Sequence, residues 1–223
     1  MTGALEARLD WGAVDCVVLD MDGTLLDLRF DHLVWNERLP QVRSEALAGS
    51  LESVREQTRV ELEQTRGTLI YYCMEHWSRT FGLDLFAIEA ELESRIRTRP
   101  GARDFLAHVS ALERQLILAT NAHPRSLERK MQLTELAGFF DHIVSSHELG
   151  YAKEDPEFWV ALSDRADFNP ERTVLIDDNH AVLDTAAAFG VKYLFAVARP
   201  DSAGDPVSSE NYRCLDSFEE LLS

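Results

Sequence analysis

The sequence predicts an α/β protein built as a doubly wound parallel sheet with an inserted group of helices. Strand-like apolar runs recur five times along the 223 residues, at residues 14–19, 116–119, 142–144, 173–176 and 191–197. Helical patterns separate the later runs and cover residues 102–112, 124–137 and 156–166. Apolar strands that alternate with helices are typical of a parallel sheet that is covered on both faces.

One more helix follows the fourth run and completes this alternation. Val182, Ala186 and Phe189 have the i, i+4 and i+7 spacing of one helical face, and Gly190 supplies a C-terminal stop. Beyond the fifth run, residues 201–211 have the Ser, Pro, Gly and Asp composition of a flexible loop.

The interval between the first and second runs breaks the alternation. Residues 28–99 contain no convincing strand, but apolar residues recur there at helical spacing, at positions 47, 51 and 54, at 73, 77 and 81, and at 85, 88, 92 and 96. An insertion after the first strand would lie over the carboxyl edge of the sheet, where it can exclude water and contact a substrate. The simpler alternative is an extra helical layer. We predict a core of residues 1–27 and 100–223 and a helical cap of residues 28–99.

Composition narrows the class of partner. The chain is 45% hydrophobic, which is ample for a globular core, and its formal net charge is −17. Nucleic acid polymers and anionic membranes bind clusters of Lys and Arg, so this charge opposes both kinds of partner. A small phosphorylated substrate meets the same repulsion, and a divalent cation is the obvious source of local positive charge.

Cysteine usage and the N-terminus indicate a cytoplasmic protein. The three cysteines, Cys16, Cys73 and Cys214, are widely spaced, with no pairing typical of a zinc site or a disulfide framework. Residues 1–11 lack the basic and then apolar order of a signal peptide, and no apolar run approaches membrane-spanning length.

The most informative motif follows the first apolar run. Asp20 and Asp22 come directly after residues 14–19, and Gly23 next to them allows a sharp turn. The carboxyl end of a strand is the usual place for a ligand crevice in an open α/β sheet. The same residues could form an ordinary turn, because Asp and Gly are common there. We favour a catalytic pair, in which Asp20 attacks phosphorus and Asp22 handles the proton of the leaving group.

Three weaker signals lie at or just after the ends of later strands. Thr120 and Asn121 end the second run, Lys153 follows the third, and Asp177 and Asp178 end the fourth. Each has a simpler explanation, as a helix cap, a solvated lysine or acids that favour a helix dipole. Because all of them fall at the same edge of one sheet, we expect them to form one site.

This set of residues suits metal-assisted phosphoryl transfer. Mg²⁺ prefers carboxylate oxygens together with water and substrate phosphate. Asp20, the backbone carbonyl of Asp22, and one or both of Asp177 and Asp178 could supply the protein ligands. These carboxylates outnumber the single lysine, and each like-charge contact at about 4 Å costs on the order of 4 kcal/mol at an effective dielectric constant near 20. Such a site would exclude a phosphate dianion unless a metal ion were bound.

The other residues of the set can bind the phosphoryl group and carry out the chemical steps of its transfer. Lys153 can hold a phosphate oxygen, and the Thr120 hydroxyl and backbone N–H groups near Asn121 can donate hydrogen bonds to the phosphoryl group. A carboxylate nucleophile forms an aspartyl-phosphate and divides hydrolysis into two easier displacements. Asp22 would protonate the leaving alcohol and then deprotonate the attacking water. Neighbouring carboxylates would help it to keep its proton near neutral pH.

The ordered set Asp20-x-Asp22-Gly23-Thr24, Thr120-Asn121, Lys153 and Asp177-Asp178, with helices inserted after the first motif, resembles the haloacid dehalogenase superfamily of phosphohydrolases with a helical cap. The resemblance covers nearly the whole chain. It implies a Rossmann-like core, dependence on Mg²⁺, a nucleophilic Asp20 and a general acid/base Asp22. It also implies that Thr120 and Lys153 bind phosphate and that Asp178 binds the metal directly. Asp177 would bind the metal directly, through water, or act as a partner of Lys153.

A closer resemblance points to the branch of purine 5′-nucleotidases that act on GMP and IMP. It rests on residues 15–28, 72–84, 120–124 and 150–155. One motif departs from the family pattern, because many capped members have Lys-Pro-x-Pro where this chain has Lys153-Glu154-Asp155-Pro156. Pro156 still suits the first turn of a helix.

The insertion carries aromatic side chains that could stack on a purine, at a gain of about 1–3 kcal/mol per base. They are Trp35, Tyr71, Tyr72, His76 and Trp77. Aromatic residues at helical spacing are more often part of a core. Arg66, Arg125 and His123 could contact phosphate or base, but we expect them to be surface or packing residues, and we expect His180 to be structural rather than catalytic.

Other functions fit less well. The main alternative is a phosphatase or phosphomutase for another small metabolite, such as phosphoglycolate or a sugar phosphate. Dehalogenation is disfavoured by Asp22 and Asp178, and phosphonate cleavage requires a cap lysine that residues 28–99 lack. A phospho-accepting receiver module would carry its motifs in a different order and would have no such insertion. A binding protein without catalysis is disfavoured because every chemical position is filled.

Overall fold

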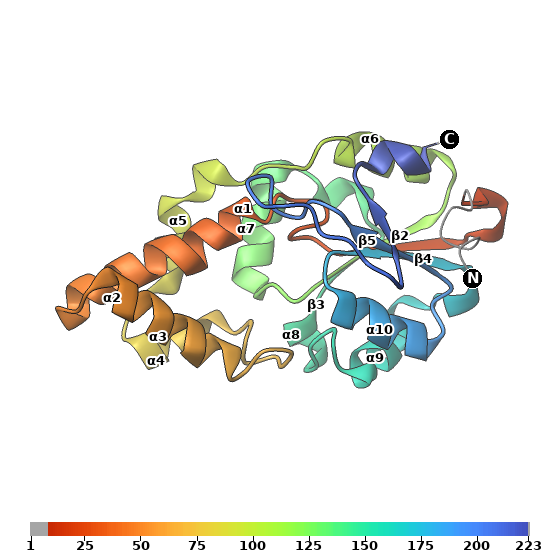
Figure 1. The fold of residues 1–223 in the computed structure, drawn as a ribbon. Helices are drawn as coiled ribbons and strands as arrows, with labels where there is room; N and C mark the ends of the chain where they lie inside the picture. The colour runs from red at the N-terminus through yellow and green to blue at the C-terminus, as the bar shows by residue number, and fades with distance from the viewer. Residues whose placement is uncertain (1–8, 223) are drawn as a thin grey trace.

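A six-stranded sheet forms the centre of the molecule in this computed structural model, which describes residues 9–222 (Figure 1). The strands run parallel in the order β3-β2-β1-β4-β5-β6. They are β1 (Cys16–Leu19), β2 (Gln115–Thr120), β3 (His142–Ser145), β4 (Thr173–Asp177), β5 (Tyr193–Val197) and β6 (Arg213–Leu215). The five predicted strands are confirmed. The sequence did not predict β6, which is short and lies at the edge of the sheet.

The register aligns the carboxyl ends of the three central strands. Leu19 at the end of β1 lies opposite Leu118 on one side and Ile176 on the other. The order of the strands reverses at β1, because the chain continues to β2 on one side and later returns to β4 on the other. Crevices at the carboxyl edge of such a reversal are the usual binding sites in open α/β sheets.

Helices cover both faces of the sheet, as the sequence predicted. In β1, Val17 and Leu19 pack into the core on one face, whereas Cys16 and Val18 pack into the core on the other. The first face is covered by α6 (Ala102–Ala111) and α7 (Pro124–Thr134), and the second by α9 (Pro156–Ala166) and α10 (His180–Phe189). Both faces of β1 are therefore buried, which is why its sequence is continuously apolar.

Three predicted boundaries were wrong by two residues or more, and one of them is the start of the first strand, which begins at Cys16 and not at residue 14. The helix predicted over residues 124–137 ends at Thr134, because Glu135 adopts a left-handed conformation with φ of 54° and a short 3₁₀ turn follows at Ala137–Phe139. The strand predicted to begin at residue 191 begins at Tyr193. The backbone N–H of Val191 instead donates to the carbonyl of Ala186 and closes the end of α10.

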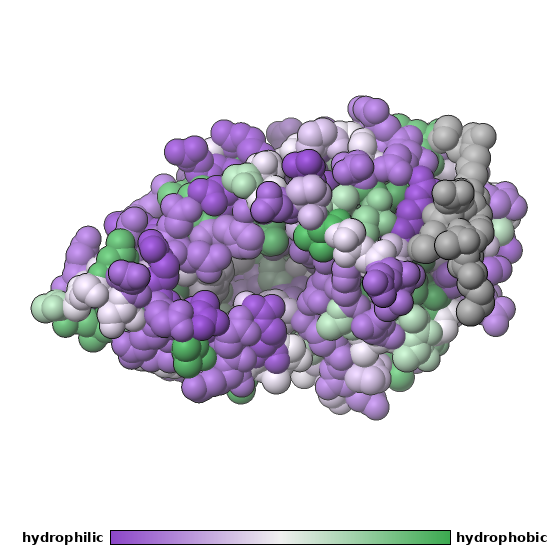
Figure 2. Space-filling model, viewed as in Figure 1, coloured by the Kyte–Doolittle hydropathy of each residue, from purple (hydrophilic) through white to green (hydrophobic). Residues whose placement is uncertain are grey.

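We call the helices between β1 and α6 the helical lobe. It contains α1 (Arg29–His32), a π-helical segment (Leu33–Arg38), α2 (Leu39–Leu47), α3 (Leu51–Glu63), α4 (Met74–Phe81), α5 (Leu85–Glu91) and a 3₁₀ turn (Glu93–Arg95). This interval forms no strand, as predicted, and α2 and α3 extend away from the sheet (Figure 1). A hollow lies between the lobe and the sheet on one face of the molecule (Figure 2).

The two segments that join the lobe to the sheet run side by side. The backbone N–H of Asp27 donates to the carbonyl of Arg97, and that of Arg99 donates to the carbonyl of Leu25. Because residue 20 lies just before this pair of segments, the lobe joins the sheet next to the predicted site. None of the helices formed by residues 9–222 combines the length and the apolar character needed to cross a bilayer.

Candidate active site

The turn after β1 brings the first predicted aspartates to the edge of the sheet. The backbone N–H of Asp20 still donates to the carbonyl of Ile176 in β4, at 3.1 Å. Gly23 then adopts a φ of +89°, and a Cβ atom there would lie only 2.5 Å from Asp178 Oδ2. Glycine is required at this position because of both its conformation and the close approach of Asp178.

Lys153 links the ends of β1 and β4. Its Nζ donates to Asp20 Oδ1 at 2.5 Å and to Asp177 Oδ2 at 2.7 Å. All three residues are buried, with relative exposures of 2% for Lys153, 5% for Asp20 and 0% for Asp177. Of the roles considered for Asp177, the partner of Lys153 is the one seen here.

The acids at this edge hold protons more strongly than free carboxylates do. Burial, opposed by Lys153, raises the pKa of Asp177 to about 7. Burial also raises the pKa of Asp20, and burial together with the charges of Asp20 and Asp177 raises the pKa of Asp178 well above its usual value. Burial disfavours the charge of Lys153, but Asp177 and Asp20 outweigh this and raise its pKa. One lysine therefore does not neutralise the site.

The arrangement fits a hard divalent cation. Asp20, Asp177 and Asp178 each offer an oxygen, and these three atoms lie within 4.8 Å of one another. Asp20 Oδ2 is buried and has no hydrogen-bond partner in the described part of the chain. Oxygen ligands in such a cluster are those that Mg²⁺ prefers, and a cation would compensate the unpaired charge.

The Asp22 side chain points to a different lysine. Lys130 Nζ lies 2.8 Å from Asp22 Oδ1 and 2.8 Å from Asp31 Oδ1. Burial raises the pKa of Asp22 to about 6, with a further contribution from Asp31 and an opposing one from Lys130. The sequence correctly predicted the direction of this shift. However, burial is the largest cause, and the sequence analysis did not count Lys130 among the charges.

Asn121 joins the loop after β2 to the loop that carries Lys153. Its Oδ1 accepts from the backbone N–H of Lys153 at 2.9 Å, and its Nδ2 donates to Glu154 Oε2 at 2.9 Å. The Thr120 hydroxyl accepts from the backbone N–H of Ala122 at 3.0 Å. Both side chains are buried at the edge of the sheet, next to the acids.

Glu154, the departure from the family pattern, connects the helical lobe to this edge. Tyr72 from the lobe donates its hydroxyl to Glu154 Oε1 at 2.5 Å, and Asn179 Nδ2 donates to the same oxygen at 3.0 Å. With Asn121, three segments thus meet at one carboxylate. Pro156 begins α9, as predicted, and the Asp155 side chain caps that helix.

Most of the other residues singled out in the sequence are packing or surface residues. Trp77 is 3% exposed and belongs to the core that the lobe shares with one face of the sheet. Arg125 stacks on the ring of Phe86, with 3.7 Å from its Cζ to the ring centroid. His123 pairs with Glu75 of the lobe, with 2.5 Å between Nε2 and Oε2.

The sequence analysis missed Lys130 and Asp31 and gave Glu154 no partner. One signal for Lys130 was available, because it lies on the same face of α7 as Leu127, Met131 and Thr134, which are buried. A lysine on a buried face is rare unless it is paired. The partners themselves are 108 and 99 residues away in the chain, and no local pattern identifies them.

Comparison with known proteins gives the family. A model of the haloacid dehalogenase-like hydrolases matches residues 14–190. The chain belongs to this family. The match includes every residue of the candidate site, and the enzyme is a hydrolase with the α/β fold of its family.

Two relatives are similar to this hydrolase in sequence, and one solved structure is similar to it in fold. The GMP/IMP nucleotidase YrfG of Escherichia coli (strain K12) is 36% identical over 218 residues, which are 98% of each chain. A phosphorylated carbohydrates phosphatase of Thermotoga maritima is 22% identical over 216 residues, 94% of this chain and 97% of its own. The crystal structure of a phosphatase of the same superfamily from Thermococcus onnurineus superposes with a TM-score of 0.77 at 18% identity, covering 93% of this chain and 96% of its own.

Proposed function

We propose that this hydrolase is a Mg²⁺-dependent 5′-nucleotidase that converts purine nucleoside monophosphates, GMP and IMP, to nucleoside and phosphate. The 36% identity to a GMP/IMP nucleotidase along 98% of both chains carries the proposal for the substrate. The unpartnered Oδ2 of the buried Asp20, whose Oδ1 is held by Lys153, supports a carboxylate nucleophile.

The residues of the chain divide the reaction into two displacements. Asp20 Oδ2 attacks phosphorus, and the P–O bond to the 5′ oxygen breaks as the new P–O bond forms. Asp22 gives its proton to the departing 5′ oxygen. In the second displacement Asp22 takes a proton from water, whose oxygen attacks phosphorus and releases phosphate and Asp20. One residue can serve both steps because they need opposite proton transfers.

The other residues hold the phosphoryl group. The Thr120 hydroxyl, backbone N–H groups near Asn121 and the ammonium group of Lys153 can donate to its oxygens. Mg²⁺ would be held by Asp20, the backbone carbonyl of Asp22 and Asp178, with Asp177 as a direct or indirect ligand, and when bound it neutralises charge on the phosphoryl oxygens.

We also infer that residues 28–99 act as a cap on a core of residues 1–27 and 100–223. The lobe joins the sheet through two paired segments, residues 25–27 and 97–99, shortly after Asp20 in the chain, and Tyr72 contacts the carboxyl edge of the sheet through Glu154. A cap in this place can exclude water from the aspartyl-phosphate and contact the leaving group. With a net charge of −17, we expect a small cytoplasmic metabolite rather than a polymer or membrane as the partner.

A second candidate is a phosphatase or phosphomutase for another metabolite, such as a sugar phosphate or phosphoglycolate. The phosphorylated carbohydrates phosphatase of Thermotoga maritima favours it, because that relative also spans 94% of this chain. It shares the proposed core chemistry and differs only in the leaving group.

A panel of phosphate-release assays tests the substrate. GMP, IMP, AMP, pyrimidine monophosphates, sugar phosphates and phosphoglycolate are compared with Mg²⁺ present. We expect the highest kcat/KM for GMP and IMP. Weak activity on every nucleotide with strong activity on another phosphate ester would assign the second candidate instead.

Two further measurements test the mechanism. We expect exhaustive chelation of metal to abolish turnover and added Mg²⁺ to restore it. Asp20→Asn should lose turnover by at least about 10³-fold, because the displacement has no other nucleophile. Mass spectrometry of the variant controls for deamidation back to Asp. Turnover that survives chelation, or normal activity in an Asp20→Asn protein that has not deamidated, would refute the mechanism.

A further inference from the structure

Lys130 is a buried cation for which the proposed reaction has no use. It lies on α7, is 1% exposed, and contacts acids other than the two that Lys153 contacts. Its Nζ contacts Asp22 Oδ1 at 2.8 Å and both oxygens of Asp31, at 2.8 and 3.1 Å. The ring centroid of Phe30 lies 5.0 Å from the same nitrogen. A charge in such a place is retained only with partners that satisfy it.

The contact fixes the direction of the Asp22 carboxylate. In the described residues, Lys130 is the one group that donates a hydrogen bond to this side chain. Hydrogen bonds between charged groups are short and directional, so one oxygen of Asp22 is held while the other stays available. The Asp22 side chain is 17% exposed, so it is not sealed from a substrate.

The same lysine joins Asp22 to the helical lobe. Asp31 belongs to α1, the first helix of the lobe. One turn before Lys130 on α7, the hydroxyl of Ser126 donates to Glu89 Oε2 of α5 at 2.8 Å. One face of α7 therefore contacts two lobe helices and the second catalytic aspartate.

We propose that Lys130 is the positioning residue for Asp22. Because Asp31 of α1 contacts the same lysine, this positioning also depends on where α1 packs against α7. The inference rests on the proposed function, because it gives Asp22 the role of protonating the leaving alcohol. Lys130 gives up no proton in this scheme. The proton moves between Asp22 and the leaving oxygen, and then between water and Asp22.

A purely structural role makes a different prediction. Removing one partner of a buried ion pair destabilises a fold. Such damage lowers activity on every substrate alike. A loss of positioning lowers activity only where the leaving group needs a proton. An alkyl phosphate such as GMP needs one, whereas p-nitrophenyl phosphate releases a stable phenolate without one. Since kcat/KM reports the steps up to departure of the leaving group, the ratio of kcat/KM for the two substrates separates the two roles.

The test compares Lys130→Met with the wild type on GMP, or on another alkyl phosphate that the wild type hydrolyses, and on p-nitrophenyl phosphate. General acid catalysis contributes about 10²–10⁴-fold, so we expect kcat/KM for the alkyl phosphate to fall at least about 30-fold. For p-nitrophenyl phosphate we expect a change within about threefold, because the variant keeps Asp20 and Lys153. Lys192→Met is the control for loss of a lysine away from Asp22: Lys192 is exposed and lies beside Tyr193 of β5, so this variant should leave the ratio unchanged.

Two variants extend the test to Asp31 and to folding. Asp31→Asn should lower the ratio of kcat/KM for the alkyl phosphate to that for p-nitrophenyl phosphate by about three- to tenfold. The reason is that Lys130 loses one of the two carboxylates that it contacts. If Lys130→Met folds poorly by circular dichroism, the double variant Lys130→Met/Asp31→Asn replaces it. That variant removes one charge of each sign and so leaves a smaller imbalance in the cluster. We expect it to show the selectivity of Lys130→Met.

Asp22→Asn distinguishes failure of this inference from failure of the proposed function. We expect Asp22→Asn by itself to lose activity on the alkyl phosphate but not on p-nitrophenyl phosphate. In the double variant Asp22→Asn/Lys130→Met, we expect the second substitution to cause no further loss. Equal losses on both substrates for Lys130→Met, with selectivity kept in Asp22→Asn, would overturn the role of Lys130 alone. An Asp22→Asn protein without selectivity would overturn the role of Asp22 and this inference with it.

Discussion

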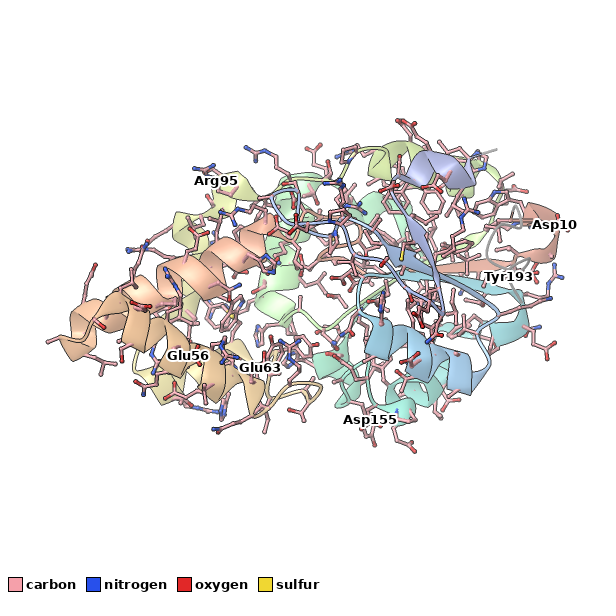
Figure 3. All side chains as sticks on the ribbon, viewed as in Figure 1. Asp10, Glu56, Glu63, Arg95, Asp155 and Tyr193 are labelled. Carbon is pink, nitrogen blue, oxygen red and sulfur yellow. The ribbon has the colours of Figure 1, made fainter. Side chains whose placement is uncertain are left out.

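The carboxyl edge of the sheet and the outer surface of the helical lobe carry the same kind of interaction in opposite surroundings. At the edge, Lys153 is paired with Asp20 and Asp177, and the three side chains are at most 7% exposed. On α3 and just after it, the Arg59–Glu56 and Arg66–Glu63 pairs lie on the surface, with side chains 38–63% exposed (Glu56 and Glu63 are labelled in Figure 3).

The difference teaches where charge matters in this protein. Water screens the surface pairs, so each contributes about 0–1 kcal/mol. Breaking a buried pair leaves an uncompensated charge and costs about 3–5 kcal/mol. We therefore expect substitutions at the edge to change both function and folding, and substitutions on the surface of the lobe to change neither.

The largest effect is expected for Lys153→Met. It removes the cation shared by Asp20 and Asp177, and we expect turnover to fall by about 10²–10³-fold or more. The free energy of unfolding should fall by about 3–5 kcal/mol if the acids stay charged. Phosphate release and urea unfolding measure the two effects. If Lys153→Met keeps wild-type turnover, the buried ion pairs at the edge matter no more for function than the surface pairs of the lobe do.

The next largest effect is expected at the hydrogen bond between Tyr72 of the lobe and Glu154 at the edge of the sheet. Tyr72→Phe and Glu154→Gln each weaken the link from the lobe to the edge, and a hydrogen bond to a charged group contributes about 1.5–3 kcal/mol. We expect kcat/KM to fall about tenfold in each and the double variant to lose little more. Tyr71→Phe is the matched control, because Tyr71 packs on Tyr72 and its hydroxyl has no bond to Glu154. Fully additive losses would show that the two residues act separately.

A smaller effect is expected from the pH dependence of the free energy of unfolding at His123 and His147, where the helical lobe contacts the sheet domain. Burial lowers the pKa of His147, and burial, opposed by Glu75, lowers the pKa of His123. The rings lie 5.1 Å apart, and the charges facing them are Glu75 from α4 and Arg125 from α7. At these two histidines the folded protein thus binds fewer protons than the unfolded chain does. Their contribution to the free energy of unfolding is therefore fully present above pH 6.5, the ordinary pKa of histidine, and is lost as the pH falls below that value.

Urea unfolding at several pH values measures this effect. We expect the free energy of unfolding of His147→Gln to depend less on pH than that of the wild type between neutral and acidic pH. The comparison between the two proteins cancels the contribution of the carboxylates, which they share. Parallel curves would contradict the assignment.

The smallest effect is expected at the surface of the lobe. Arg59→Ala removes the pair with Glu56, and we expect the free energy of unfolding to change by at most about 0.5 kcal/mol and kcat/KM to stay constant. Urea unfolding at low and high salt checks both the size and the screening. A loss near that of Lys153→Met would show that exposure does not separate the two regions.

The sequence by itself determined the sheet and the edge of the sheet at which the proposed site residues lie. Residues 16–19 and 174–176 are continuously apolar because both faces of a central parallel strand are buried, so composition alone indicates β1 and β4. Parallel strands that start in register end at one edge, and this brought Asp20, Thr120, Lys153 and Asp177 together, as their order in the chain predicted.

Only the tertiary structure decided which charges compensate one another. The lysine of Asp22 is Lys130, 108 residues further along the chain, and the partner of Tyr72 is Glu154, 82 residues away. Hydrophobic periodicity reports which face of an element is buried, but it contains nothing about what lies opposite that face. Pairing between distant side chains depends on how the helical lobe packs on α7 and on the loops at the edge of the sheet, and packing of that kind is a property of the whole chain.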